Sequence, residues 1–317
     1  MSEPPPLAWV VGAGGLLGRH VVAALAGSGY AVRTSRVPWP EEDATLAVLE
    51  ADLLRFVADR AGRPWLLAWC AGAGVVATDG ARLESERRVF ERFTALLGAE
   101  RDDDGHGVVL LASSAGGVYA GSAGPPFDED SVPAPLVPYG HTKLAMETVL
   151  SAAVARTGSR AVLARLANVY GPGQRLDKPQ GLLSQLCLAD ATRRPVPVFV
   201  ALDTIRDYLF VADAARMLVR CAALARHEPA GTGVVKVLAS GRPVTVGHLV
   251  AEARRVLHRP LRTVLAPGRP GQVLDLRLAS VRWAEVDALA ATPLAAGLAA
   301  TAADVRERVL ARGRPRG

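Results

Sequence analysis

The sequence has few cysteines, few lysines and no long apolar run. Its three cysteines, Cys70, Cys187 and Cys221, are odd in number and widely spaced. Because such spacing provides neither a disulfide framework nor a metal site, it favours a protein of a reducing compartment. No unbroken run of about 18 apolar residues occurs, as a membrane-spanning helix would need. The opening MSEPPPL leads into an apolar segment without a basic stretch before it, so we expect a cytoplasmic protein that does not contact a membrane.

The shortage of lysine means that the positive charge comes almost wholly from arginine. Lys143, Lys178 and Lys236 are the lysines among 37 basic residues, and the net charge is +6. The arginines are scattered rather than clustered, which fits a small anionic ligand or a solvated surface better than a nucleic-acid-binding stripe. We therefore expect no nucleic acid among the partners.

Apolar segments and helical periodicities alternate along the first half of the chain. Half of all residues are hydrophobic, which is enough to bury a large core. Residues 7–14, LAWVVGAG, are typical of a strand buried on both faces, and residues 15–29 of a helix. The alternation continues to the strand expected at residues 159–171, and it indicates crossover units on a parallel sheet. The predicted fold class is α/β, a Rossmann-type doubly wound parallel sheet with a smaller, discontinuous C-terminal substrate lobe.

Domain boundaries are expected where this regularity breaks. Loops rich in proline and glycine follow Gly171, regular segments return within residues 206–240, and the pattern breaks again after Gly241. We predict a dinucleotide-binding domain over residues 1–170, with residues 204–240 returning to it. Residues 171–203 and 241–317 are predicted to form a substrate-binding lobe over the carboxyl ends of the strands, where doubly wound sheets bind ligands.

A glycine-rich segment follows the first predicted strand. In VVGAGGLLGRH, Gly12, Gly15 and Gly18 lie between strand and helix, where missing side chains let backbone amides and the helix N-terminus approach a pyrophosphate. The alternative is an ordinary tight turn, but the position in a βαβ series favours dinucleotide binding. The residues predicted to contact this cofactor are Gly12, Gly15, Leu16, Leu17, Gly18, Ser35, Arg36, Ala71, Gly72, Tyr139 and Lys143.

The end of the second predicted strand bears on the choice of dinucleotide. A carboxylate there usually holds the adenosine ribose of NAD, but this strand ends with Arg33, Thr34, Ser35 and Arg36. Guanidinium and hydroxyl groups suit a 2′-phosphate. The sequence therefore favours NADP over NAD, with a solvated loop as the alternative role for Arg36.

Tyr139 and Lys143 form a second candidate site, in PYGHTKLAMETVL. Residues four apart share one helix face, and a neighbouring ammonium and a positive nicotinamide favour the phenolate form of a tyrosine. Such a tyrosine is a workable proton shuttle for an alcohol or carbonyl oxygen. Ser113 and Ser114 lie where an earlier predicted strand leaves the sheet, and a hydroxyl there can hydrogen-bond the reacting oxygen.

These segments resemble the extended short-chain dehydrogenase/reductases, the family of NAD(P)-dependent nucleotide-sugar epimerases, dehydratases and ketoreductases. The resemblance covers nearly the whole chain. It rests on four blocks in family order: GAGGLLG; SSAGGVYAG followed by PPFDED and PYGHTK; RLANVYGPG; and RDYLFVAD.

The resemblance implies roles for individual residues. Tyr139 would be the acid and base, Lys143 would order the cofactor ribose and lower the tyrosine pKa, and Ser114 would bind the substrate oxygen. A second group would contact the sugar diphosphate and consists of Asn168, Arg206 and Arg269, the last in GRPGQ. Each of the three has an alternative role. Asn168 could simply end a strand at a turn, Arg206 could form a structural ion pair with Asp207, and Arg269 could be a surface arginine.

The chain departs from the family pattern at three points. Three residues before its VY dipeptide stands Ala115 where many relatives have serine or threonine, whereas counting back from Tyr139 gives Ser114. The Asp-Glu pair of the family's 4,6-dehydratases is absent from this loop, which argues against dehydration. Residues 43–62 are predicted to form one helix, so the family's third strand and its adenine-side aspartate are missing, and Asp52 becomes a helix carboxylate.

Two chemistries use these same residues. A sugar epimerase oxidises a hydroxyl, lets the ketone rotate and returns the hydride, whereas a 4-ketoreductase consumes NADPH once per turnover. We favour an epimerase of a nucleotide sugar, with an NADPH-dependent 4-ketoreductase of a nucleotide keto-deoxysugar as the alternative. A non-catalytic dinucleotide sensor and a carbonyl reductase of other substrates are less favoured. The helices expected at residues 84–100 and 139–156 resemble those through which the family forms homodimers.

Overall fold

The centre of the protein is a six-stranded parallel sheet in the order β10-β5-β4-β3-β1-β2. The computed structural model describes residues 4–60, 62–72, 79–102, 105–177, 181–266 and 273–313. The strands of this sheet are β1 (Leu7–Val11), β2 (Ala31–Thr34), β3 (Trp65–Trp69), β4 (Gly107–Ser114), β5 (Arg160–Leu166) and β10 (Gly233–Leu238). The strand order reverses between β1 and β3, which is where doubly wound sheets bind ligands at the carboxyl ends of the strands.

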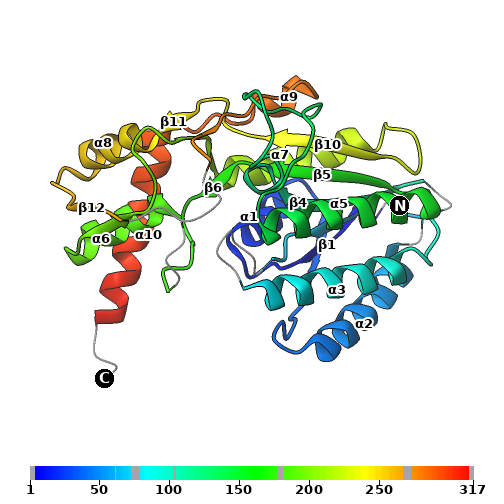
Figure 1. Ribbon diagram of the computed structural model, residues 1–317. Coiled ribbons are helices and arrows are strands. Elements are labelled where there is room, and N and C mark those ends of the chain that lie inside the picture. The colour runs from blue at the N-terminus through cyan, green and yellow to red at the C-terminus, as the bar shows by residue number, and fades with distance from the viewer. Residues whose placement is uncertain are drawn as a thin grey trace.

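Helices cover both faces of this sheet (Figure 1). Helices α2 (Glu42–Arg60), α3 (Gly80–Leu97) and α5 (Pro138–Thr157) pack on one face, and α1 (Leu16–Gly27) and α7 (Val211–Ala225) pack on the other. Alternate residues of β1 point to opposite faces, so Trp9 enters the first core and Val10 the second. The predicted Rossmann-type α/β fold is confirmed.

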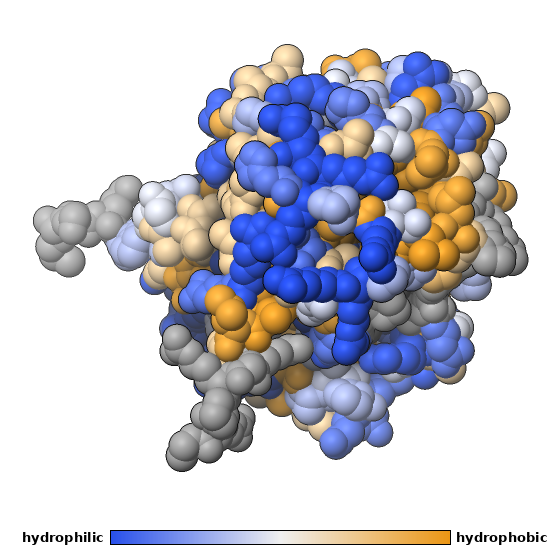
Figure 2. Space-filling view, turned by 90° about the vertical axis from the view of Figure 1, so that its left-hand side faces the viewer, coloured by the Kyte–Doolittle hydropathy of each residue, from blue (hydrophilic) through white to orange (hydrophobic). Residues whose placement is uncertain are grey.

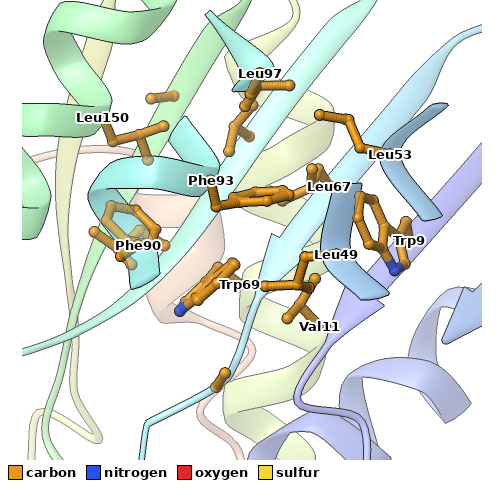
Figure 3. Packing of buried hydrophobic residues seen from close by; sticks show 14 of the residues in the cluster. Trp9, Val11, Leu49, Leu53, Leu67, Trp69, Phe90, Phe93, Leu97 and Leu150 are labelled. Atoms are coloured by element: carbon orange, nitrogen blue, oxygen red, sulfur yellow. The ribbon is translucent and has the colours of Figure 1, made fainter. Parts of the chain in front are cut away.

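Aromatic rings fill the core beneath α2 and α3 (Figure 3). Phe93 lies between Trp9 and Trp69, with ring centroids 5.7 and 5.0 Å away. Edge-to-face and tilted ring pairs of this kind each add about 1 kcal/mol to the stability gained from burial. Trp9 also reaches the end of β2, because its indole N–H donates to Ser35 Oγ at 2.8 Å.

Helix α2 connects β2 directly to β3, and within the described residues β2 is an edge of the sheet. The expected helix over residues 43–62 is therefore confirmed, with observed bounds Glu42–Arg60. Leu46, Leu49, Leu53 and Phe56 of this helix are buried at spacings of three and four residues, which is the pattern of a helix with one buried face.

A second core lies beside the main sheet. It is built from α6 (Leu182–Thr192), α8 (Val246–Leu257) and α10 (Leu294–Gly313), together with the short parallel pair β7 (Val196–Val198) and β12 (Thr263–Leu265). Two further small sheets join it to the rest. One has the order β11-β8-β13 and the other pairs β6 with β9. Their strands are β6 (Asn168–Tyr170), β8 (Ile205–Arg206), β9 (Tyr208–Phe210), β11 (Val244–Thr245) and β13 (Asp275–Leu276), and the short helices are α4 (Ala115–Val118) and α9 (Ala284–Asp287).

The face that carries this second core has a broad band of hydrophilic residues with separate apolar areas beside it (Figure 2). Arginines of this lobe are paired with acids, as in Arg306–Asp190 at 2.9 Å and Arg255–Glu252 at 2.6 Å. Pairing of this kind balances the charge of these two arginines locally. Among the helices that the structure describes, none combines the length and the hydropathy that a membrane crossing requires.

Candidate functional site

The turn between β1 and α1 needs glycine at two of its positions. Gly12 has φ +86°, and a Cβ atom there would lie 2.5 Å from the backbone nitrogen of Ala71. A Cβ on Gly18 would lie 2.2 Å from the carbonyl oxygen of Gly12. Side chains would therefore push β3 and α1 away from the turn. The glycines of VVGAGGLLGRH bring the end of β3 and the start of α1 together.

The N-terminus of α1 offers free backbone donors to an anion. Gly15 is the N-cap and provides no side-chain cap, and the first turn, which opens with Leu16 and Leu17, has no acidic residue. The uncapped N–H groups and the positive end of the helix dipole together favour a bound phosphate.

Arg19 adds a cation that the sequence analysis missed. Its guanidinium donates to the carbonyl oxygens of Gly14 at 2.9 Å and Gly15 at 3.2 Å, which folds the side chain over the glycine turn. A Cβ atom on Gly173 would lie 2.8 Å from this guanidinium, so the GPGQ loop passes directly beside it. The available signal was the spacing, because a residue four positions after the N-cap lies on the first turn of the helix.

Among the described residues, the end of β2 has one arginine that forms no ion pair with an acid. Ser35 donates its hydroxyl proton to Asp52 at 2.6 Å, and Arg33 forms an ion pair with Asp59. Arg36 is exposed, and no ion pair joins it to an acid of the described ranges. The guanidinium of Arg36 is therefore the group at this strand end that is available to a phosphate.

Tyr139 and Lys143 share one face of α5, as the spacing predicts. The Lys143 ammonium lies 5.8 Å from the centre of the Tyr139 ring. It donates to Glu86 Oε1 of α3 at 2.9 Å, and both side chains are at most 9% exposed. Burial by itself lowers the pKa of Lys143, but Glu86, Tyr139 and Glu147 outweigh it and hold the pKa above its ordinary value. The ammonium is thus kept charged beside the phenol.

Gly72, which follows β3, lies against this ion pair. A Cβ atom there would lie 3.3 Å from Lys143 Nζ and 3.4 Å from Glu86 Oε1. Ala71 contacts Gly12, as described above, so the short segment of Ala71 and Gly72 connects the glycine turn to the Tyr139–Lys143 face. Residues predicted to bind the cofactor from three parts of the chain therefore meet at the carboxyl ends of β1 and β3.

Ser113 and Ser114 have different surroundings. Ser113 is buried and donates its hydroxyl to Glu147 at 2.5 Å. Ser114 Oγ accepts the backbone N–H of Gly117 at 3.2 Å as the N-cap of α4, and its own proton stays available to a ligand. Ala115, the other position suggested by the family pattern, is fully buried.

One pocket brings Ser114, Asn168 and Arg206 together. It is lined by Ser114, Gly116, Gly117, Ala120, Val137, Leu166, Ala167, Asn168, Arg206, Asp207, Val273, Leu276 and Leu278. The Tyr139 ring borders it through Gly117, because a Cβ atom on that glycine would lie 3.1 Å from the ring. The expected continuous strand over residues 159–171 is instead broken at Ala167 into β5 and β6, and Asn168 begins the second piece. The break allows Asn168 to pair with β9 rather than continue the main sheet.

Backbone contacts hold the two polar groups that face Ser114 across this pocket. Asn168 Nδ2 donates to the carbonyl oxygen of Asp207 at 3.0 Å. Arg206 donates to the carbonyl oxygens of Ile205 at 2.7 Å and Val273 at 2.6 Å. Both side chains are thereby fixed by main-chain groups of residues 205–207 and, for Arg206, also of Val273 before β13.

Arg206 is a partly buried cation that no carboxylate of the described residues neutralises by direct contact. Asp207, its neighbour and the expected alternative partner, instead accepts hydrogen bonds from the backbone and hydroxyl of Ser240 at 2.7 and 3.0 Å. Burial lowers the pKa of Arg206, and Tyr208 and Asp275 offset part of that effect. A desolvated guanidinium at a pocket wall favours an anionic ligand. Arg269, predicted to act with it, lies outside the described residues.

The chain resembles known nucleotide-sugar enzymes along part of their length. It is 28% identical over 142 residues to dTDP-4-dehydro-6-deoxyglucose reductase of Escherichia coli, covering 45% of this chain and 43% of that protein. It is 30% identical over 175 residues to UDP-glucose 4-epimerase of Azospirillum brasilense, covering 51% of this chain and 50% of that protein. The chain thus matches about half the length of these curated relatives.

The similarity of the fold covers nearly the whole chain. The structure of UDP-glucose 4-epimerase from Thermotoga maritima superimposes with a TM-score of 0.75 at 21% identity, covering 96% of this chain and 99% of that one. The model of the "NAD dependent epimerase/dehydratase family" matches residues 8–236. This range includes the glycine turn, the Tyr139–Lys143 pair, Ser114, Asn168 and Arg206. The chain therefore belongs to the NAD dependent epimerase/dehydratase family.

Proposed function

We propose that this protein is an NAD(P)-dependent epimerase of a nucleotide-activated sugar, acting through a transient keto intermediate. The observation that carries the proposal is the meeting of Ser114, Asn168 and Arg206 in one pocket bordered by Tyr139. A hydroxyl donor, a proton shuttle and a partly desolvated cation are what hydride chemistry on an anionic sugar substrate requires.

The proposed dinucleotide site consists of the glycine turn, Ala71, Gly72, Tyr139 and Lys143. These residues fit such a cofactor because the turn leaves no room for side chains and the N-terminus of α1 has no side-chain cap. When bound, the nicotinamide would supply the hydride acceptor and donor. In the NADP form of the proposal, Arg36 would hold the 2′-phosphate, since Ser35 has its proton engaged with Asp52.

Each polar residue of the pocket would have one task. Ser114 would donate a hydrogen bond to the reacting oxygen, and Tyr139 would take the proton of that hydroxyl group and later return it. Lys143 would keep a positive charge beside the Tyr139 ring. Arg206 and Asn168 would hold the diphosphate, with Arg269 as a further ligand. Residues 171–203 and 241–317 would form the substrate lobe over the carboxyl ends of the strands.

A 4-ketoreductase of a nucleotide keto-deoxysugar is the second candidate. The observation that favours it is the exposed Arg36 at the end of β2, because a reductase uses NADPH as a consumed substrate. Dehydration has little support, since the turn after Ser114 is Ala-Gly-Gly-Val and contains no carboxylate. The homodimer and the cytoplasmic location stay predictions.

Mass spectrometry of the small molecules released on denaturing the purified protein would separate the two chemistries. A stoichiometric dinucleotide would support the epimerase, because its cofactor is regenerated within each cycle. An empty protein that binds NADPH reversibly and reduces a dTDP-4-keto-6-deoxy sugar would support the reductase. Tyr139→Phe should keep cofactor binding and lose turnover in either case. A wild-type protein with no affinity for NAD, NADP or a nucleoside diphosphate would disprove the proposal.

A further inference from the structure

Glu86 is a largely buried acid that contacts Lys143 of the proposed dinucleotide site. It lies on α3, its side chain is 9% exposed, and its Oε1 accepts from Lys143 at 2.9 Å. The segment GARLESERRVFERFTALL that contains it is rich in charge, and its other acids are more exposed, with Glu84 at 46% and Glu91 at 33%. Glu86 therefore differs from its neighbours in burial and in its partner.

The charges around Lys143 come from a small set of groups. Glu86 faces it from α3, and Tyr139 and Glu147 face it from its own helix α5. Glu147 is itself paired with Arg165 of β5 at 2.7 Å, so its charge is balanced elsewhere. Glu86 is therefore the acid that balances the charge of Lys143.

We propose that Glu86 is a positioning residue that holds Lys143 at the dinucleotide site and, by balancing the charge of its ammonium, favours the oxidised nicotinamide over the reduced one. The inference rests on the proposed function and deepens it. The oxidised ring carries one positive charge and the reduced ring carries none. An ammonium alone would repel the oxidised form, whereas a Lys143–Glu86 pair has no net charge.

This preference matters for the choice between the two chemistries. An epimerase begins its cycle by taking hydride from the substrate, so its resting cofactor must be oxidised. A ketoreductase begins with the reduced form. The pair of Lys143 and Glu86 lies against Gly72, one of the residues predicted to bind the cofactor. It would bias the bound cofactor toward the oxidised form, which an epimerase needs.

The test is the ratio of dissociation constants for oxidised and reduced dinucleotide. The reduced form is titrated by its fluorescence, and the oxidised form by calorimetry or by competition. Glu86→Gln keeps the size and an acceptor oxygen but removes the charge. We expect the ratio of the oxidised to the reduced constant to rise on the order of tenfold, and Glu86→Asp to restore it toward the wild-type value. Glu84→Gln, an exposed charge change on the same helix, should leave the ratio unchanged.

A double variant separates an effect of charge from an effect of impaired folding. Glu86→Gln combined with Lys143→Met removes both charges, so the ratio should return close to the wild-type value even if both affinities fall. Equal weakening of both forms in Glu86→Gln would mean a purely structural role and would overturn the inference. A shift of the same size in Glu84→Gln would overturn it too. A wild-type protein that binds neither form would instead reject the proposed function itself.

Discussion

Ser113 and Ser114 are adjacent in the chain but face opposite sides of β4. Ser113 donates to the buried Glu147, and Ser114 lines the pocket with Asn168 and Arg206. Successive residues of a strand alternate between its faces, so only one of the two hydroxyls can reach a substrate in this pocket. The structure thus gives the two neighbouring serines different surroundings.

Replacing these serines should separate catalysis from stability. Ser114→Ala removes the proposed donor to the reacting oxygen, and we expect kcat to fall by about 100-fold or more. Ser113→Ala removes a buried hydrogen bond and should cost about 1–3 kcal/mol of unfolding free energy with little change in kcat. Steady-state kinetics and chemical denaturation of both variants would check this. A larger loss of kcat in Ser113→Ala would assign the catalytic hydroxyl to the other serine.

Arg206 should control affinity for the diphosphate. Arg206→Gln removes the partly buried guanidinium, and we expect UDP or dTDP to bind about 10-fold to 100-fold more weakly, since hydrogen bonds to charged groups contribute about 1.5–3 kcal/mol. Calorimetric titration with the free nucleotide measures this without turnover. Arg277→Gln is the matched control, because Arg277 is 44% exposed and is paired with Asp275. Unchanged affinity in Arg206→Gln would sink the nucleotide-sugar proposal.

Arg36 should discriminate between the two dinucleotides. Arg36→Ala should weaken NADP binding by about tenfold while NAD binding stays the same, because only NADP has the 2′-phosphate that a guanidinium can hold. Arg33→Ala serves as the comparison, since Arg33 is engaged by Asp59. Equal affinities for NADP in wild type and Arg36→Ala would mean that Arg36 is a solvated residue.

Removing one partner of the Glu147–Arg165 pair behind the site should destabilise the protein strongly. Both side chains are at most 6% exposed and joined at 2.7 Å, and Arg165 also donates to the Tyr119 hydroxyl at 2.7 Å. Arg165→Met leaves the Glu147 carboxylate buried without its cation, at a cost of about 3–5 kcal/mol. Urea denaturation would measure the loss. Arg255→Met, which breaks an exposed pair with Glu252, should change stability by less than about 1 kcal/mol.

The Lys143 ion pair should stabilise the protein except at high pH. The folded pKa of Lys143 lies above its ordinary value of 10.5 despite burial, because nearby acids outweigh the desolvation. A raised pKa of a basic group stabilises the fold fully below the unfolded pKa, and this contribution is lost as pH rises through the folded pKa. Lys143→Met should therefore be less stable than wild type at neutral pH, with the difference shrinking above pH 10.5. A difference that stayed constant into that range would contradict the assignment.

The sequence predicts the main sheet well because its signals are local. Buried strands such as Trp65–Trp69 are continuous apolar runs, and the helix after Ser35 shows its period directly. The Tyr139–Lys143 pair also follows from spacing within one helix. These features depend on residues that are close together in the chain, and their pattern can therefore be recognised in a single sequence.

The parts that the sequence does not predict depend on contacts between distant segments. Glu86 meets Lys143 across 57 positions, and Asp52 reaches Ser35 from the next helix. The break at Ala167 depends on the pairing of β6 with β9, which hydrophobic pattern alone does not reveal. Arg19 was missed because its spacing from the N-cap places it on the first turn of the helix but does not show that its guanidinium folds back over the glycine turn.

The position of β8 between β11 and β13 also sets an order of assembly. Arg206 lies on β8, which pairs with Val244–Thr245 on one side and Asp275–Leu276 on the other. The glycine turn needs only segments made early in translation, whereas the cation of the pocket is fixed by strands that emerge near residue 276. During synthesis, the wall that would select the substrate is completed long after the turn that would receive the cofactor.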